Sequence, residues 1–456
     1  MQNEKYSSSK RQSRRSFLGK MAAGATLLTG TPYILSGSSV ERSDLYRPAR
    51  FSANDQIQIA VIGAGGMGIA DTDSALRIPG VKLVAACDLF DGRLTAAKER
   101  WGKGIMTTRD YREILNRSDI DAVIIATPDH WHKQISVDAL KAGKAAYCEK
   151  PMVHSITEGP AVIAAQKESG KTYQVGSQGM SSLGNEKAKE LYEAGAIGQL
   201  IYAEGFWARN SPTGAWQYPI PKDASEKTVG WDAYVSNTTK RAYDPLRFFR
   251  WRNYRDYGTG VSGDLFVHLF SSLHFITSSI GPEKIMATGG LRYWKDGREV
   301  PDVLLGMFDY PETTAHPAFN LSLRVNFVDG TSGSTYLRMV GSEGAMDVTW
   351  DDVYLRKNLA SDPMDAFLQA KTSEGALSND RKKMLPPKES HFSVEKGYKG
   401  AHYDHFFNFF NSIRNNEMAK EDAVFGYRAA APALLCNDSY FENKIVNWDP
   451  NNMKLR

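Results

Sequence analysis

The stretch Ile57-Gln-Ile-Ala-Val-Ile62, followed directly by Gly63-Ala-Gly65-Gly-Met-Gly68, decides the fold of this chain. The first half is a short apolar run typical of a buried strand, and the second is a G-x-G-x-x-G pattern that opens a helical stretch. In this setting the glycines permit a tight turn, close approach of a pyrophosphate, and close packing of helix on strand. The start of the helix adds amide donors and a positive dipole. We therefore expect a dinucleotide site whose contacts are Gly63, Gly65, Gly66, Met67 and Gly68.

An acidic residue at the end of the next apolar run supports this interpretation. Asp88 lies 20 residues after Gly68. A carboxylate at that place can bind the adenosine ribose hydroxyls and repels a 2′-phosphate. We therefore predict NAD as the cofactor. Arg93 is near enough in sequence to keep NADP open.

The pattern around this stretch alternates apolar runs with helical segments. Expected strands cover residues 57–62, 81–87, 122–127, 145–148 and 172–175, and expected helices cover 69–77, 94–101, 111–116, 132–142 and 157–169. Alternation of this kind predicts a parallel, doubly wound sheet. The fold class is thus α/β for a nucleotide-binding domain over residues 55–178.

Two of the expected strands end in chemically distinctive residues, and ligands of such sheets bind at the strands' carboxyl ends. Thr127-Pro128-Asp129-His130-Trp131-His132 follows the third of them, so Trp131 could pack against the cofactor. The two histidines are as readily structural as functional. Glu149-Lys150-Pro151 follows the next strand, and Pro151 forces the chain to turn there. Lys150 either meets a substrate hydroxyl beside the nicotinamide or is a surface lysine paired with Glu149.

The second part of the chain, residues 179–445, has a different pattern. Longer β-like runs occur at 200–209, 284–294, 303–310, 319–328, 334–340 and 346–356. Turn signals such as Asp296-Gly297 and Asp329-Gly330 suggest antiparallel pairing between them. A helix is expected at 262–278 and closing helices at 401–414 and 421–441, whereas the polar stretch 358–400 is expected to be irregular.

Together, the glycine turn, Thr127-Pro128, Glu149-Lys150-Pro151 and the two-part layout resemble the Gfo/Idh/MocA family of NAD(P)-dependent sugar and cyclitol oxidoreductases. The resemblance covers about residues 55–440. It implies a second domain with a large, mainly antiparallel open β-sheet that covers the nicotinamide. It also implies that Lys150 is catalytic, that Thr127, Pro128, Trp131, His132 and Glu149 lie at the cofactor, and that the protein is a dimer or tetramer.

The same family places an aspartate and a histidine four residues apart on a helix of the second domain, and Asp264 and His268 match that spacing. Residues four apart share a helical face. The expected roles are His268 as the base and Asp264 as the group that holds its tautomer. The family form has glycine between the two, whereas this chain has Phe266. The alternative is a helix-capping Asp264 and a core His268.

An aromatic and basic segment precedes that helix, Arg247-Phe-Phe-Arg250-Trp251-Arg252-Asn-Tyr254-Arg255, and Trp207, Trp216 and Trp231 lie upstream. Planar rings beside guanidinium groups suit a sugar, whose faces are apolar and whose edges are polar. We expect Trp251 and Arg252 to contact the substrate. A protein interface is the alternative.

The excess positive charge of the chain lies at its N-terminus. The 456 residues carry a net charge of +4, and residues 1–40 hold six Lys or Arg against one Glu, so the remainder is close to −1. This balance removes the main electrostatic support for nucleic-acid binding. Arg14-Arg15-Ser-Phe-Leu and the apolar run after it resemble a twin-arginine export signal, which predicts a bacterial periplasmic protein. The run is only mildly apolar, so a stable membrane span is not expected.

Three cysteines without metal-like spacing predict neither a disulfide framework nor a zinc site, and no metal is expected. Three functions remain open. The leading one is oxidation of a secondary hydroxyl of a sugar, glycoside or cyclitol, with a tightly bound, recycled cofactor. A redox-neutral glycoside hydrolase or lyase acting through a 3-keto intermediate is the second, and a non-catalytic carbohydrate-binding protein is the third.

Overall fold

A six-stranded parallel sheet begins the part of the chain that the computed structural model describes, residues 56–330, 335–357 and 388–456. Its strand order is β3-β2-β1-β4-β5-β6. The strands are β1 Ile57–Ile62, β2 Val81–Cys87, β3 Met106–Thr108, β4 Ala122–Ile125, β5 Ala145–Glu149 and β6 Tyr173–Gly176. The order reverses between β1 and β4, and the carboxyl ends of strands at such a point form a ligand-binding crevice.

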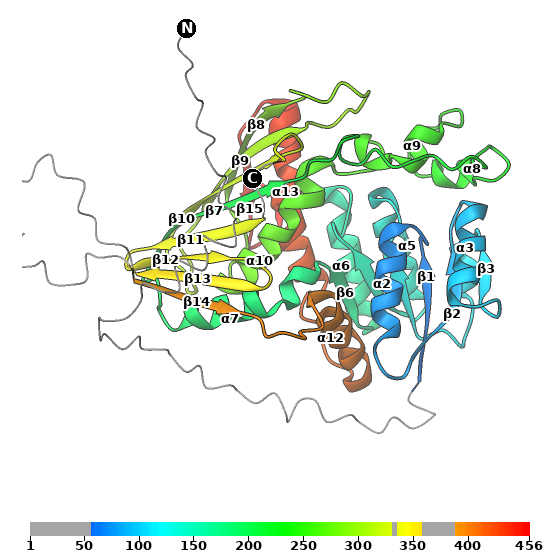
Figure 1. The fold of residues 1–456 in the computed structure, drawn as a ribbon, viewed down its shortest axis with the longest axis horizontal. Coiled ribbons are helices and arrows are strands. Elements are labelled where there is room, and N and C mark those ends of the chain that lie inside the picture. The colour runs from blue at the N-terminus through cyan, green and yellow to red at the C-terminus, as the bar shows by residue number, and fades with distance from the viewer. Residues whose placement is uncertain (1–55, 331–334, 358–387) are drawn as a thin grey trace, which may run out of the picture. The chain divides into compact units, whose positions relative to one another are not determined.

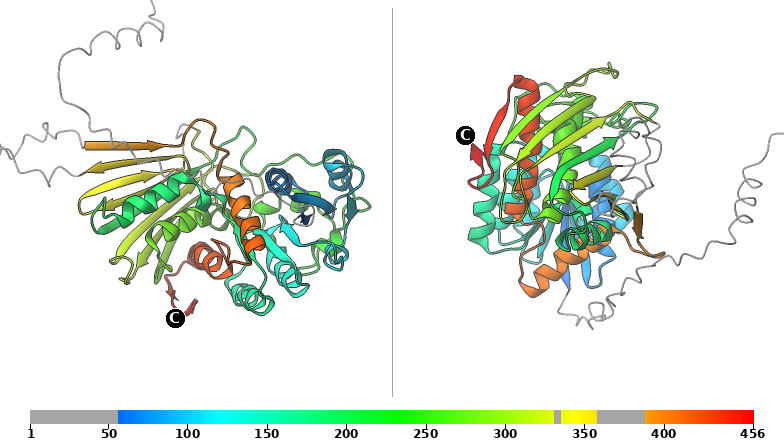
Figure 2. Two further views of the ribbon diagram at one scale, coloured as in Figure 1. Left: turned by 90° about the horizontal axis from the view of Figure 1, so that it is seen from below. Right: turned by 90° about the vertical axis from the view of Figure 1, so that its left-hand side faces the viewer.

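Helices cover both faces of this sheet, as Figures 1 and 2 show. They are α2 Gly66–Leu76, α3 Asp91–Trp101, α4 Tyr111–Leu115, α5 His132–Lys141 and α6 Gly159–Ser169. The strands are almost completely buried because helices lie on either side of them, which explains their continuous apolar sequences. The predicted doubly wound domain is confirmed.

A second sheet of ten strands follows, in the order β14-β13-β12-β11-β7-β10-β9-β8-β15-β16. The strands are β7 Leu200–Ala208, β8 Lys284–Gly290, β9 Val303–Tyr310, β10 Phe319–Asn326, β11 Tyr336–Gly341, β12 Gly344–Val348, β13 Asp352–Lys357, β14 Lys388–Ser393, β15 Val446–Asp449 and β16 Lys454–Leu455. The sheet is mainly antiparallel, as expected, but β7 and β10 are parallel. The alternating burial of β9 and β10 shows one face packed and one open.

Three expectations for this sheet were wrong. Asp329-Gly330 does not join neighbouring strands, because β7 lies between β10 and β11. The run 346–356 is not one strand but the hairpin of β12 and β13, with Trp350 in its turn. The polar stretch 358–400 contains β14, which pairs with β13 through its backbone and needs little apolar sequence at the sheet edge; residues 358–387 lie outside the described residues.

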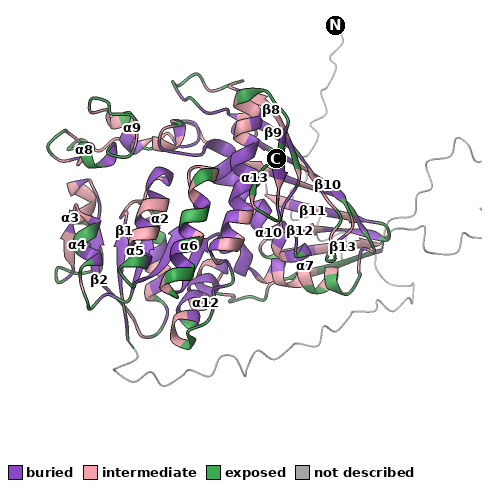
Figure 3. Ribbon diagram, turned by 180° about the vertical axis from the view of Figure 1, so that it is seen from behind, coloured by how far each residue is buried: buried purple, intermediate pink, exposed green. Residues whose placement is uncertain are grey.

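Four further helices follow the first sheet: α7 Leu183–Glu193, α10 Val267–Thr277, α12 Ala401–Asn415 and α13 Ala423–Glu442. Figure 3 shows that α10 and α13 are largely buried. The residues before α10, Ser262–Phe266, form a π-helical turn where a continuous α-helix was expected. Within the described residues, no helix combines the length and apolar character needed to span a membrane.

Helix α12 returns to the nucleotide-binding domain, although the expected boundary assigned it to residues 179–445. Phe406, Phe409 and Phe410 are fully buried in the same core as β1, β4 and β5. The ring of Phe406 stacks on Tyr147 of β5 with centroids 4.3 Å apart. The first domain is therefore completed by a segment from the end of the chain.

Between β7 and α10 a long segment with the short helices α8 Trp231–Tyr234 and α9 Pro245–Phe249 extends back over the first domain (Figure 1). A single β-bridge joins Val229 to Phe90. The indole of Trp131 donates a hydrogen bond to the Tyr234 carbonyl at 3.1 Å. This segment forms one wall of the space beyond the parallel strands.

Candidate active site

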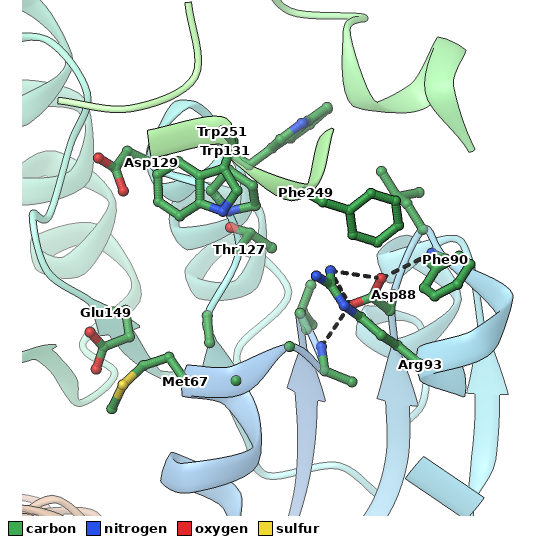
Figure 4. A pocket seen from close by; sticks show the side chains of 18 of the residues that line it. Met67, Asp88, Phe90, Arg93, Thr127, Asp129, Trp131, Glu149, Phe249 and Trp251 are labelled. Carbon is green, nitrogen blue, oxygen red and sulfur yellow. Dashed lines mark hydrogen bonds and ion pairs between the residues drawn. The ribbon is translucent and has the colours of Figure 1, made fainter. Parts of the chain in front are cut away.

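A cavity of about 1400 Å³ lies at the carboxyl ends of the parallel strands. Its walls come from the glycine turn, from the loops after β4 and β5, from the segment with α8 and α9, and from the second sheet and α10. Figure 4 shows Asp88, Arg93 and Phe249 at one end, and Met67 and Glu149 at the other. All the residues predicted at the cofactor line this cavity except Gly68, which packs beneath the turn.

The glycine turn fits a pyrophosphate. Gly63 has φ +96°, and a Cβ there would lie 2.5 Å from the Ala126 carbonyl oxygen. A Cβ on Gly68 would lie 1.8 Å from the Gly63 carbonyl oxygen. Both positions therefore require glycine for close packing. A Cβ on Gly66 would meet no atom within 4 Å, so it would occupy the cavity itself. The absent side chains leave space for a phosphate beside the first amides of α2.

Asp88, which follows β2, links the glycine turn to the end of that strand through hydrogen bonds. Its carboxylate accepts hydrogen bonds of 2.9 Å from the amides of Ala64 and Phe90. The guanidinium of Arg93 lies 3.5 Å from the same carboxylate and over the rings of Phe248 and Phe249. The carboxylate is thus fixed at the place where the adenosine ribose of a dinucleotide is expected.

His132 is a buried cation that links two loops of the site. Its Nδ1 lies 2.7 Å from the Pro151 carbonyl oxygen and its Nε2 lies 2.9 Å from that of Thr127. Only a doubly protonated imidazole donates to both. Burial by itself would lower the pKa of His132, but Cys148, Asp129 and the Pro151 carbonyl raise it to about 10. His132 therefore holds the loop after β4 against the loop that carries Lys150.

Lys150 is paired with Asp264 rather than with Glu149. Its Nζ lies 2.8 Å from Asp264 Oδ1 and 2.7 Å from the Asp264 backbone carbonyl. The Nε of Arg252 lies 3.1 Å from the same Oδ1. Burial alone would raise the pKa of Asp264, but Lys150 and Arg252 hold it well below its usual range. The ammonium group is therefore fixed at the junction of the two sheets.

His268 lies beside these groups but is not held by Asp264. Its Nδ1 is buried without a hydrogen-bond partner, and both Asp264 oxygens face basic side chains. The predicted Asp264–His268 dyad is thus replaced by an Asp264–Lys150 pair, because the cations compete for the carboxylate and the π-helical turn alters the spacing before α10. The ring instead packs on Trp207 and Trp350, with centroids 5.2 and 6.1 Å away. Burial and the charge of Lys150 lower its pKa well below the usual value, so the ring is neutral.

A second carboxyl group, which sequence reasoning missed, lies behind Glu149. Asp71 of α2 is fully buried, and neither of its oxygens has a donor. It adjoins the Glu149 carboxyl closely enough to hydrogen-bond it, which requires a proton on one of the two. Burial raises the pKa of Glu149 to about 7, and burial together with Glu149 raises that of Asp71 well above its usual value. The pair therefore retains a proton near neutral pH.

Replacing Asp71 should stabilise the protein at alkaline pH. Raised carboxyl pKa values mean that the folded chain keeps protons that the unfolded chain releases, so the pair's contribution to stability is fully present below about pH 4 and is lost as the pH rises towards 7. Asp71→Asn supplies an amide donor to Glu149 and removes the repulsion. We expect a gain on the order of 1–3 kcal/mol at pH 8 relative to pH 5, measured by urea unfolding.

The control is Asp73→Asn on the same helix, where Arg100 bonds the carboxylate and lowers its pKa. That variant should lose a little stability at pH 8. Equal destabilisation of Asp71→Asn at both pH values would contradict the shared proton.

The aromatic and basic segment is divided between the cavity and the core. Trp251 and Arg252, the predicted substrate contacts, both line the cavity, as do Trp207 and Asp129. Trp216 packs on Phe327 and Trp231 stacks on Tyr234, so these two are structural.

Sequence reasoning also missed Arg209, Trp350 and His402, which line the same cavity. The sequence places Trp350 within the expected strand run 346–356 and His402 within the expected closing helix 401–414. Their approach to the site depends on the hairpin of β12 and β13 and on the return of α12, which local sequence does not indicate.

Comparison with known proteins agrees with this geometry. Residues 57–177 match the model of the Gfo/Idh/MocA oxidoreductase family, described as having an NAD-binding Rossmann fold. Residues 57–177 thus resemble the nucleotide-binding domain of that family.

Curated relatives match part of the chain. Inositol 2-dehydrogenase from Salmonella typhimurium is 31% identical over 148 residues, which cover 31% of this chain and 44% of the relative. Alpha-N-acetylgalactosaminidase from Shewanella oneidensis is 29% identical over 188 residues, or 39% of either chain. The chain thus spans less than half the length of these curated relatives.

Solved structures resemble almost the whole of the described fold. Levoglucosan dehydrogenase in complex with NADH and levoglucosan has a TM-score of 0.64 at 19% identity and covers 86% of this chain and 99% of its own. Aldose-aldose oxidoreductase from Caulobacter crescentus complexed with glycerol has a TM-score of 0.63 at 16% identity over the same shares. These likenesses establish that the two-sheet architecture is shared.

Proposed function

We propose that this protein is an NAD-dependent oxidoreductase that acts on a secondary hydroxyl of a sugar, glycoside or cyclitol. One observation carries the proposal. Lys150 is fixed by Asp264 at 2.8 Å, and the cavity that holds this pair is continuous from the glycine turn to the aromatic residues of the second sheet. The cavity thus has room for a dinucleotide at one end and a polar ring at the other. The names of the relatives and structural neighbours point to the same class.

The residues at the glycine turn fit NAD, which supplies a hydride acceptor when bound. Lys150 would donate a hydrogen bond to the substrate hydroxyl, and its positive charge would lower the pKa of that hydroxyl. His268 is neutral and can accept the hydroxyl proton. Its Nδ1 is covered, so Nε2 is the nitrogen that can meet a ligand. Asp264 and Arg252 would hold the ammonium in place.

The decisive experiment is mass spectrometry of denatured, purified protein for released NAD or NADP, followed by a screen of sugars, glycosides and cyclitols for cofactor reduction. We expect the protein to retain NAD, and we expect at least one sugar, glycoside or cyclitol to reduce the bound cofactor. The absence of both, in protein whose fold is verified by circular dichroism, would refute the proposal.

Asp88 should decide between the two cofactors. Asp88→Ala removes the charge and the acceptors for Ala64 and Phe90, so the affinity for NAD should fall by about 10- to 100-fold while that for NADP changes less. Asp88→Asn, which keeps an acceptor, should lose less. Quenching of tryptophan emission by each cofactor measures this. Purified native protein that carries only NADP would contradict the assignment.

A redox-neutral cleavage is the second candidate, favoured by the match to an alpha-N-acetylgalactosaminidase. Oxidation at C3 acidifies the C2 hydrogen, so a glycosidic substituent can be eliminated before the ketone is reduced again. The same Lys150 and His268 would serve the first step. Product analysis separates the two functions. A keto-sugar with reduced cofactor indicates net oxidation, whereas free sugar, or an unsaturated sugar whose ketone has been reduced again, without net reduction of the cofactor indicates cleavage.

Export through a twin-arginine pathway, with delivery to the periplasm, remains our proposal for residues 1–40, which lie outside the described residues. A protein that folds around its cofactor before export would need to retain and recycle that cofactor. Arg14→Lys with Arg15→Lys should leave the protein in the cytoplasm on fractionation. Unchanged recovery from the periplasm would overturn the localisation.

Self-association is also proposed, because the open face of the second sheet carries exposed apolar residues. Ile201 of β7 and Leu305 and Met307 of β9 are 54%, 44% and 56% exposed. Light scattering of the purified protein should report a dimer or tetramer. A monomer at micromolar concentration would exclude a stable assembly.

A further inference from the structure

Three basic side chains surround a single carboxylate at the substrate end of the cavity. Asp264 lies 2.8 Å from the Lys150 ammonium, 3.1 Å from the Arg252 guanidinium and 4.0 Å from that of Arg209. One carboxylate cannot neutralise three cations. The positive charge therefore exceeds the negative charge at this point.

Arg209 is the cation that Asp264 does not satisfy. Lys150 and Arg252 are within hydrogen-bond distance of the carboxylate, and their side chains are 10% and 23% exposed. The Arg209 side chain is 45% exposed and lies too far from Asp264 for a hydrogen bond. Among the described residues it has no side-chain hydrogen bond, so its five donors remain available.

The other acidic side chains at the substrate end of the cavity, Glu149 and Asp129, have hydrogen-bond partners other than Arg209. Glu149 accepts a hydrogen bond from Gln178 at 2.5 Å, and its carboxyl neighbours that of Asp71. Asp129 Oδ2 accepts from the Thr259 amide and hydroxyl at 3.0 and 2.7 Å. Within the described part of the chain, neither acid forms an ion pair with Arg209. Among the described residues, the acid paired with this guanidinium is therefore Asp264 alone, and Asp264 is shared with Lys150 and Arg252.

The expected cofactor phosphates lie elsewhere. They belong at Gly65 and Gly66, and a Cβ on Gly65 would be 3.5 Å from the guanidinium of Arg93. Arg209 neighbours Asp264 and so stands at the end that holds Lys150 and His268. Any anion that Arg209 binds would be part of the substrate.

Arg209 is also adjacent to a surface suited to a sugar ring. Trp207, two residues earlier, stacks on the His268 ring, and Trp350 lies edge-on to that ring with centroids 6.1 Å apart. Trp207, Arg209 and Trp350 all line the cavity. A ring that packs on the indoles would hold its substituents within reach of the guanidinium.

We propose that the substrate is a sugar with a fixed anionic oxygen group, a carboxylate or a sulfate, which Arg209 binds while Lys150 and His268 act on a ring hydroxyl. The inference rests on the proposed function and deepens it. A planar guanidinium offers paired N–H donors to two oxygens of either anion, which distinguishes it from hydroxyl-binding groups. A neutral sugar would leave this cation with only the shared Asp264 carboxylate as a counter-charge.

The test compares matched sugars with the cofactor-loaded enzyme. Glucose, glucuronate and glucose 6-sulfate form one series, and galactose, galacturonate and galactose 6-sulfate form another. Initial rates of cofactor reduction give kcat and KM. At least one acidic sugar should exceed its neutral parent in kcat/KM by about 10-fold or more, and the preferred anion separates carboxylate from sulfate recognition.

Substitutions of Arg209 test how much its guanidinium contributes to binding of the acidic sugar. Arg209→Gln should raise KM for the acidic sugar by about 10- to 100-fold with little change in kcat, and Arg209→Lys should restore part of the affinity. KM for a neutral sugar should change less than about 3-fold. The control is Arg324→Gln on β10, which removes the same charge from an exposed guanidinium that bonds Tyr336 outside the cavity. It should leave every constant unchanged.

The outcomes separate this inference from the proposed function. Turnover of neutral sugars with no preference for acids and no effect of Arg209→Gln would overturn the inference while the oxidoreductase stands. If no sugar supports cofactor reduction, the proposed function fails, and calorimetric titration with glucuronate and with glucose 6-sulfate then decides the inference. Binding that weakens in Arg209→Gln supports it, and binding that is absent or unchanged in that variant refutes it.

Discussion

Lys150→Met should reduce turnover by about 10²- to 10⁴-fold, the usual contribution of a positioned acid–base group, while the protein still folds and retains NAD. Methionine keeps an apolar stem of similar length but cannot donate a hydrogen bond or lower the pKa of a substrate hydroxyl. The glycine turn is untouched. The loss should appear in net oxidation and in redox-neutral cleavage alike, because both begin with the same proton and hydride removal.

Single-turnover kinetics with the true substrate measures this loss, and mass spectrometry verifies that the cofactor remains bound. The matched control is Lys189→Met on α7, whose ammonium bonds the Phe275 carbonyl outside the cavity. Turnover of Lys150→Met within a few-fold of the wild type would rule out the mechanism.

Asp264→Asn should reduce turnover nearly as much as Lys150→Met does, by about 10²-fold. A dyad in which Asp264 only orients His268 would predict a milder effect. The structure instead pairs Asp264 with Lys150 and Arg252, so the amide would leave two largely buried cations without a counter-charge. The ammonium would lose its fixed position, and its positive charge would be less favourable.

The pH dependence of turnover distinguishes two roles for Asp264, orienting His268 or holding the Lys150 ammonium in place. Loss of the counter-charge should make the ammonium form of Lys150 less favourable, which would move the alkaline limb of the kcat profile to lower pH. His268→Asn, by contrast, should reduce kcat by about 10²-fold or more without that displacement. An Asp264→Asn enzyme with a normal rate and an unmoved alkaline limb would show that the ion pair is only structural.

The nucleotide-binding domain could be predicted from sequence because its signals are local. Strand β1, the glycine turn and Asp88 follow one another within a short stretch, and burial on both faces of a parallel sheet makes each strand a continuous apolar run. Lys150 could be placed at the cavity for the same reason, since Pro151 marks the end of β5.

The substrate half of the site could not be predicted because its contacts join distant segments. The partner of Asp264 depends on a lysine 114 residues earlier in the chain. Trp350 reaches the cavity only because the run around it turns back as a hairpin. The sequence around Asp71 does not distinguish it from a polar residue on the exposed face of a helix. Only the packing of α2 shows that it lies beside Glu149. The insertion of β7 between β10 and β11 likewise leaves no local trace, since strand neighbours are set by long-range hydrogen bonds.

The return of α12 has a consequence for how this architecture can be divided. A fragment of residues 55–178 would expose the apolar side of β5 and lose Phe406, Phe409 and Phe410 from its core. It would also lose the hydrogen bond from the Arg414 guanidinium to the Pro79 carbonyl. Residues 55–178 therefore cannot be transferred to another protein as a complete dinucleotide-binding domain. Chimeras that exchange substrate specificity between relatives would need to carry the 401–415 segment together with the first domain, and their second crossover would fall after Asn415 rather than only near residue 178.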